Sequence, residues 1–157
     1  MRRRLTDPSI LILGILIAGF LSTGGSFALP QDMAGTWNVV SQIVTQCNDN
    51  DPYAPKPGMI LPPVAWTIAD SASGPTLASD KGSVTGQYTD NGVVFEFTVP
   101  ILSLDTSYTY CLTHIECFVS SPNSMYGTIE NHYRTYNYIT GATIETCIES
   151  LKFRASK

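Results

Sequence analysis

The chain has 157 residues, with nine Lys or Arg against thirteen Asp or Glu and a formal net charge of −4. Binding to nucleic acid or to anionic membrane surfaces depends on basic patches, so an acidic chain of this kind argues against both partners. The length corresponds to one domain, and 43% hydrophobic residues with few charges exclude an intrinsically disordered protein.

The N-terminus has the parts of a secretory signal peptide. A basic region, Arg2 to Arg4, is followed by an apolar run of twelve residues from Ile10 to Leu21. This run is too short for a membrane span, which needs about 20 apolar residues. Small side chains at Ser26 and Ala28 suit a signal peptidase, so we predict that residues 1–28 are cleaved after Ala28. The product would be secreted or periplasmic, with no stable membrane insertion after cleavage.

The expected mature domain, residues 29–157, alternates apolar and polar residues between clusters of turn residues. In residues 93–99, VVFEFTV, two Val and two Phe fall on one face, which is typical of a strand. The preceding Asp90–Gly92 indicates a tight hairpin, because Asn-Gly accepts positive φ. No segment shows a helical repeat. We predict eight strands, at residues 35–46, 64–70, 75–79, 83–89, 93–99, 107–119, 125–138 and 143–154.

Eight sequential antiparallel strands with short turns can close into an up-and-down barrel. Closure removes both sheet edges, which would otherwise be open to aggregation. The last three strands are long, as in barrels with tilted strands, and an eight-stranded barrel encloses either its own side chains or one small ligand. One connection is also long. Residues 48–63, rich in Pro, Asp and Asn, predict either a stiff lid or a surface spacer.

The first strand begins with Gly35-Thr36-Trp37, which resembles the G-x-W signature of the lipocalins and their calycin relatives. In that family the Trp closes one end of the barrel, and an Arg near the end of the last strand packs across it. Arg154 has the corresponding place here, and a planar cation can stack on indole. Residues 83–92 also resemble a hairpin of avidin-like domains. The resemblance implies structural roles for Gly35, Trp37 and Arg154 in a lipocalin-like barrel, and a small apolar ligand.

The mature domain contains four cysteines, namely Cys47, Cys111, Cys117 and Cys147. An even count favours disulfides in an exported chain, and without a Cys-x-x-Cys pair we predict no metal site. If Trp37 lies level with Arg154, paired residue numbers sum to 191, and Cys47 and Cys147 lie three residues from that register. We therefore prefer a Cys47–Cys147 bridge among three possible connectivities. The other two cysteines are too far apart on one extended strand, so the strand bends, they pair elsewhere, or they stay buried thiols.

The sixth and seventh predicted strands flank a turn near Pro122, so opposite residue numbers should sum to about 244. Tyr108 then faces Tyr136, and His114 faces Glu130. Even positions share one face, which is rich in Tyr, His and Glu, whereas odd positions share a more apolar face. A slip of one residue would exchange the two faces.

Three interpretations of the even face stay open. It is an outer wall stabilised by cross-strand pairs, or it lines the lumen with His114 and Arg134 as polar anchors. In the third, His114, His132, Glu116 and Glu130 bind a divalent metal, since imidazole and carboxylate are suitable ligands.

The sequence contains no serine elbow, no supported pair of Asp residues and no Gly-rich phosphate loop, so we predict no catalytic residue and no cofactor. The first hypothesis is a secreted lipocalin-like protein that binds a small, mostly apolar ligand in the barrel. The residues predicted to contact this ligand are Trp66, Phe95, Phe97, His114, Tyr133 and Arg134. The alternative is a partner-binding or assembly module with an outer aromatic face and no ligand cavity. An enzyme of the isomerase or cyclase type, with His114 and Glu130, is a third hypothesis.

Overall fold

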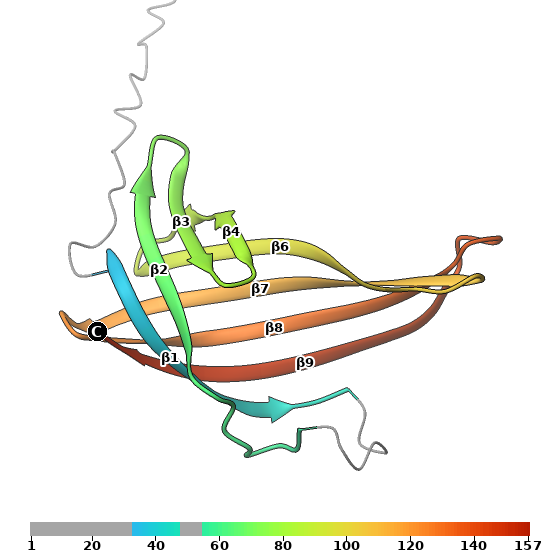
Figure 1. Cartoon of the computed structure of the whole chain (residues 1–157), viewed down its shortest axis with the longest axis horizontal. Helices are drawn as coiled ribbons and strands as arrows, with labels where there is room; N and C mark the ends of the chain where they lie inside the picture. The colour runs from blue at the N-terminus through green and yellow to red at the C-terminus, as the bar shows by residue number, and fades with distance from the viewer. Residues whose placement is uncertain (1–32, 48–54) are drawn as a thin grey trace, which may run out of the picture.

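A computed structural model of the chain describes residues 33–47 and 55–157 (Figure 1). The predicted signal peptide, residues 1–28, lies outside the described residues, as does part of the long loop before the second strand. Within the described ranges, no helix is long and apolar enough to span a membrane.

The described residues form nine antiparallel strands in one sheet. They are β1 (Gly35–Thr45), β2 (Val64–Ser71), β3 (Gly74–Ser79), β4 (Gly82–Thr85), β5 (Gln87–Tyr88), β6 (Gly92–Ser103), β7 (Ser107–Ser121), β8 (Ser124–Asn137) and β9 (Thr143–Ser156). All the predicted strands but one are present, with their ends shifted by a few residues. The exception is the strand predicted at 83–89, which is divided into β4 and β5.

The predicted fourth strand breaks at Gly86. A Cβ atom at Gly86 would collide with the Val94 carbonyl oxygen and would lie 2.5 Å from the Phe95 ring, so only glycine lets the backbone approach β6 this closely. The Gly86 amide donates a hydrogen bond of 2.7 Å to the Pro75 carbonyl oxygen. The chain therefore pairs with β3 before Gly86 and with β6 after it. The prediction of eight strands is corrected to nine for this reason.

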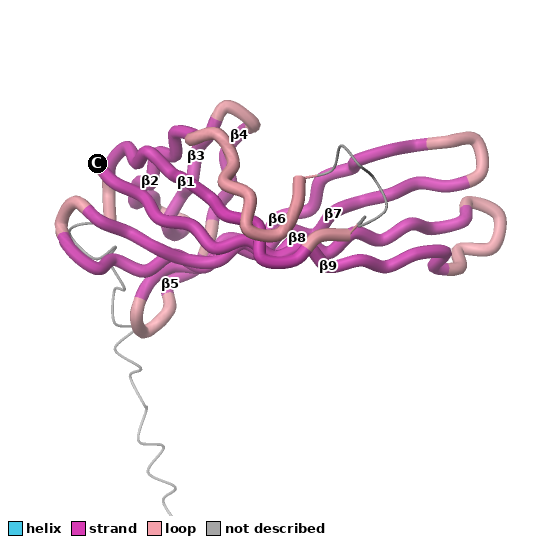
Figure 2. Tube along the Cα trace, turned by 90° about the horizontal axis from the view of Figure 1, so that it is seen from below, coloured by secondary structure: helices cyan, strands magenta, loops and turns pink. Residues whose placement is uncertain are grey.

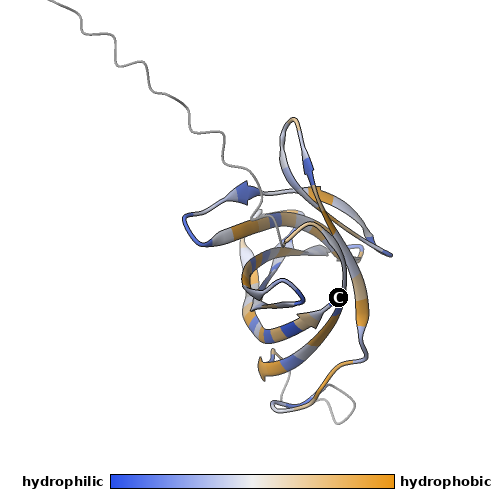
Figure 3. Ribbon diagram, turned by 90° about the vertical axis from the view of Figure 1, so that its left-hand side faces the viewer, coloured by the Kyte–Doolittle hydropathy of each residue, from blue (hydrophilic) through white to orange (hydrophobic). Residues whose placement is uncertain are grey.

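The strand order is β4-β3-β2-β1-β9-β8-β7-β6-β5, so the first and last strands of the domain are neighbours. The two strands at the ends of this order, β4 and β5, are joined directly through Gly86. As a result the sheet curls into a nearly closed barrel (Figure 3).

The pairing of β1 with β9 corrects the predicted register. Val40, not Trp37, lies opposite Arg154, so paired numbers sum to 194 rather than 191. Cys47 and Cys147 lie close to this register, and they form the predicted disulfide with their Cα atoms 5.4 Å apart. The remaining two cysteines are free and buried, which matches one of the alternatives left open.

Trp37 is fully buried, and its Nε1 donates a hydrogen bond of 2.8 Å to the Met33 carbonyl oxygen. The cation over its ring is Lys157, whose Nζ lies 4.6 Å from the ring centroid. Arg154, predicted for that role, is exposed on the outer face, because a shift of three residues reverses the face of a strand residue. Gly35 has a φ of 129°, a conformation that favours glycine.

The core fills one half of the molecule, which we call the barrel half. Trp37, Phe95 and Met125 are each 0% exposed, and the Trp66 and Phe153 rings meet edge to face at 5.1 Å. These inward side chains come from strands all around the barrel. The interior of the barrel half is therefore packed with the protein's own side chains.

The strands β6–β9 continue past the ends of β1 and β5 as a four-stranded extension with two hairpin tips (Figures 1 and 2). We define the extension as residues 99–111 and 133–147, because Val99, Cys111, Tyr133 and Cys147 are matched across the four strands at its base.

Candidate functional site

The hairpin of β7 and β8 has the predicted register. Tyr108 faces Tyr136, and His114 faces Glu130. Odd positions of β7 point into the core, and Ile115 is 3% exposed, whereas the even positions are half-buried or exposed. The even face is thus an outer wall, the first of the three interpretations.

Four of the six residues predicted to contact a ligand lie on the inner face. Trp66 and Phe95 belong to the packed core, and Phe97 is half-buried against it. Tyr133 is also half-buried, but it lies farther along the sheet at the base of the extension. The structure therefore spreads these side chains along the inner face and packs two of them inside the core.

The other two predicted contacts, His114 and Arg134, lie on the outer wall. Tyr133 and Arg134 are adjacent in β8, and consecutive strand residues point to opposite faces of a sheet. They cannot line one pocket. The six predicted residues thus do not form one site, because the prediction combined the two faces of the sheet.

The two histidines of the outer wall have separate acidic partners. His114 Nδ1 lies 2.8 Å from Glu96 Oε1, and His114 Nε2 lies 3.5 Å from Glu116 Oε1. Partial burial opposes the charged ring, but both carboxylates outweigh it and raise the pKa of His114 above its ordinary value. His132 Nε2 lies 3.4 Å from Glu130 Oε2. In the part of the chain that the structure describes, no group of three or more metal-ligating side chains is present.

The inner face carries a polar chain at the base of the extension. Thr113 Oγ1 donates to Asn131 Oδ1 at 2.8 Å, and Asn131 Nδ2 donates to Glu149 Oε1 at 3.1 Å. Burial, together with the charge of Glu149, raises the pKa of Cys111 and raises that of Tyr133 to about 12. Both groups therefore remain protonated near neutral pH, so Cys111 lacks the thiolate that a nucleophile needs.

The outer face of the extension carries a stack of tyrosine rings. The Tyr136 ring centroid lies 5.3 Å from those of Tyr108 and Tyr110, at interplanar angles of 17° and 11°, and the Tyr108 and Tyr110 centroids lie 6.5 Å apart. The Tyr110 and Tyr136 hydroxyls lie 2.9 Å apart. Hydrogen bonds from Tyr110 and from the Arg134 guanidinium lower the pKa of Tyr136. The three nearly parallel rings are arranged as a triangle, and their mutual contacts stabilise the extension.

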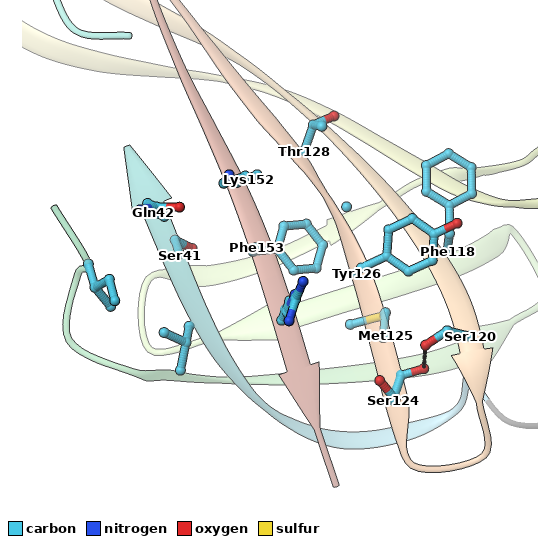
Figure 4. A pocket seen from close by; sticks show the side chains of 14 residues that line it. Ser41, Gln42, Phe118, Ser120, Ser124, Met125, Tyr126, Thr128, Lys152 and Phe153 are labelled. Carbon is cyan, nitrogen blue, oxygen red and sulfur yellow. Dashed lines mark hydrogen bonds between the residues drawn. The ribbon is translucent and has the colours of Figure 1, made fainter. Parts of the chain in front are cut away.

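The outer wall of the barrel half contains a groove of about 870 Å³ (Figure 4). It lies over β1, β9, β8 and β7 and reaches the loop before β2. Its lining residues are Val40, Ser41, Gln42, Ile60, Phe118, Ser120, Ser124, Met125, Tyr126, Gly127, Thr128, Lys152, Phe153 and Arg154.

Strand register arranges the groove residues in two rows. One row crosses four strands, from Val40 through Arg154 and Tyr126 to Phe118. The second row contains Gln42, Lys152 and Thr128. The Phe118 and Tyr126 rings lie side by side in Figure 4, with their centroids 5.6 Å apart. The first row thus supplies aromatic and aliphatic surface, and the second supplies polar groups.

Part of the long loop forms one side of the groove. Ile60 bridges to Gln42, the Ile43 amide donates to the Met59 carbonyl oxygen at 3.0 Å, and the Leu61 amide donates to the Ser41 carbonyl oxygen at 2.9 Å. Described residues of this loop therefore extend the sheet beside β1. Residues 48–54 of the predicted lid or spacer lie outside the described residues.

This groove is not among the features predicted from the sequence. The two rows of groove residues can be derived only from the correct β1–β9 register, and the predicted register differed from it by three residues. The one available signal was the alternation of β9, in which Lys152 and Arg154 occupy the outward positions between buried Leu151, Phe153 and Ala155.

No protein-family model matches the chain, and no curated protein matches it. A solved structure of EF1p2_mFAP2b bound to DFHBI is similar at 12% sequence identity and a TM-score of 0.35, covering 81% of this chain and 94% of that chain. At that level of similarity, the ligand of that protein is no guide to the ligand of this one.

Proposed function

We propose that the chain is an exported, lipocalin-like binding protein that holds a small, mostly apolar ligand in the groove on its outer wall. The observation that carries this proposal is the groove itself, whose 870 Å³ falls within the range of about 300–1,000 Å³ that is usual for small-molecule sites. The ligand is placed outside the barrel rather than within it, because Trp37 and Phe95, with the rest of the buried core, fill the barrel half.

The exposed apolar surface of the groove favours a ligand with an apolar body. Ile60 is 63% exposed, Tyr126 is 49% exposed and Val40 is 38% exposed, while Phe118 is half-buried beside them. Contiguous apolar patches often mark binding sites, since covering them removes apolar surface from water.

Export is supported by two independent features. Residues 1–28 have the pattern of a signal peptide, and the Cys47–Cys147 disulfide is typical of a protein located in an oxidising compartment.

Fluorescence titration with N-phenylnaphthylamine, a neutral apolar probe, tests the proposal. We expect the double variant Phe118→Ala/Tyr126→Ala to weaken probe binding by about tenfold or more, because each aromatic ring contributes a large contact area. Tyr138→Ala is the matched control, since Tyr138 is 51% exposed but lies on the extension. Equal binding by the wild type and the double variant would refute the groove as the site.

A second candidate function is assembly through the extension. Its two tips expose Leu104 (55%), Ile139 (85%) and Ile144 (59%), next to the tyrosine stack. Sedimentation velocity of the purified chain should then show self-association that Tyr108→Ser/Tyr136→Ser weakens. A monomer at all concentrations would count against this candidate.

A further inference from the structure

Two cations of the groove have no acidic neighbour in its lining. Lys152 and Arg154 stand two residues apart on β9 and point to the same outer face. None of the residues that line the groove is Asp or Glu. Among the described residues, no ion pair includes either cation.

This arrangement is unusual for so acidic a chain. Residues 29–157 contain six basic and twelve acidic residues, and two of those six bases meet in this groove. In the strand register, the carboxylates nearest to these two cations belong to Glu116 and Glu130. Glu116 lies opposite Thr128, and Glu130 lies opposite Ser150. Both lie outside the lining, and they contact His114 and His132 instead. The groove is therefore a locally positive site on a negative molecule.

The cations also stand next to the apolar surface. Arg154 lies between Val40 and Tyr126 in the first row, and Lys152 lies between Gln42 and Thr128 in the second. In Figure 4, Lys152 lies between Gln42 and Thr128, with the Tyr126 ring on the neighbouring strand. A ligand whose apolar body covers Tyr126 and Phe118 thus brings a polar end within reach of both cations.

We propose that Lys152 and Arg154 bind the anionic group of the ligand. The preferred ligand is then an anionic amphiphile, bound as one molecule, with a carboxylate, sulfate or phosphate head. The guanidinium of Arg154 offers two parallel donors to such a group, and Lys152 and the Thr128 hydroxyl add further donors. This inference rests on the proposed function, because it assigns the chemistry of the same groove.

Two probes that differ in one group test the inference. N-phenylnaphthylamine is neutral, and anilinonaphthalene sulfonate is the same aromatic body with a sulfonate attached. We expect the wild type to bind the sulfonate about tenfold more tightly, a ratio typical of one charge-assisted contact. The double variant Lys152→Gln/Arg154→Gln should lose this preference and still bind the neutral probe, which also shows that it is folded.

Two controls separate a specific site from a general attraction. Lys81→Gln removes an exposed lysine that pairs with Asp80 on a distant hairpin, so it should leave the preference unchanged. The exchange Lys152→Arg/Arg154→Lys keeps both charges and should retain most of the preference. Inorganic sulfate alone should compete weakly, because it lacks the apolar body.

The outcomes distinguish the inference from the function on which it rests. Equal affinity for both probes, with both weakened by Phe118→Ala/Tyr126→Ala, would overturn the inference and leave the proposed function standing. A loss of preference in Lys81→Gln as large as in the double variant would also overturn it. Binding of both probes that is insensitive to the aromatic variant would overturn the proposed function itself.

Discussion

The four strands β6–β9 run through both the barrel half and the extension, but different interactions hold the two regions. In the barrel half the inner face is a core in which Phe95 is 0% exposed and Phe153 is 2% exposed. Where the barrel half meets the extension, the same face carries Asn131, Tyr133 and Glu149, all half-buried. One continuous strand thus changes from core burial to polar pairing along its length.

The edges of the two regions differ as well. In the described residues, β6 pairs with β5 only at Val93 and Val94, and β9 pairs with β1 only from Ser150 onward. The outer strands of the extension therefore have one strand neighbour each. Cross-strand ring stacking and the Cys47–Cys147 disulfide take the place of a core there, so the extension is stabilised locally.

The largest expected effect is in the barrel half. Phe95→Ala should lower the free energy of unfolding by about 3–5 kcal/mol, because a large buried ring is lost and a cavity remains. Urea denaturation would measure this change. Val99→Ala, on the same face of β6 but 37% exposed in the extension, should cost far less. Similar losses for the two variants would contradict the division into a core and a locally stabilised extension.

Removal of the disulfide should have the next largest effect. Its cysteines are 100 residues apart in the chain, so the double variant Cys47→Ser/Cys147→Ser gives the unfolded chain much more freedom. We expect a loss of about 2–4 kcal/mol in unfolding free energy. Hydrogen exchange should accelerate most for amides of the extension. An unchanged midpoint in urea would show that the bridge does not restrain the unfolded chain.

The tyrosine stack should contribute less than the disulfide. Tyr136→Ala removes the ring that contacts both Tyr108 and Tyr110, and we expect a loss of about 1–2 kcal/mol in unfolding free energy. Tyr138→Ala, which removes a ring that contacts Tyr108 alone among described rings, should cost less. An absorbance titration of the Tyr136 variant should lose the tyrosine step with the lowered pKa. Equal costs for the two variants would argue against a larger contribution from Tyr136 than from Tyr138.

The smallest effect concerns pH. The pKa of His114 is raised above 6.5 in the folded state by Glu96 and Glu116, so the folded protein binds this proton more tightly than the unfolded chain. This contribution is fully present below about pH 6.5, and it is lost as pH rises through the raised pKa. We expect a modest decline in melting temperature over that range, because the pair is partly exposed to solvent. His114→Gln should reduce this decline. If the dependence of melting temperature on pH is unchanged by the substitution, the decline does not come from His114.

Local patterns in the sequence predicted most of the strands. The alternation in residues 93–99 and the turn near Pro122 were sufficient for β6, for the β7–β8 register and for the division into two faces, because a short hairpin fixes its own register. The Cys47–Cys147 bridge was also predicted, although from a register three residues away.

Long-range features were harder to predict. No turn links β1 to β9, so the predicted register rested on Arg154 as the cation over Trp37, a place that Lys157 occupies. Nothing in the sequence around Gly86 predicts a strand break. The break is explained only by the close approach of the Gly86 backbone to Phe95 in the folded structure. The groove depends on side chains from four strands and a loop, so it could not be predicted without the correct register between β1 and β9.

The direct link between β4 and β5 has a consequence for the way the molecule comes apart. The two ends of the sheet are consecutive segments joined by Gly86, so covalent bonds hold that corner even when its hydrogen bonds break. The junction of β1 and β9 has no such short tether and relies on ladder bonds and one sulfur bridge. Under reducing conditions, unrolling should therefore start between the terminal strands, and peptide segments from β1 should become accessible to proteases before those at the glycine corner.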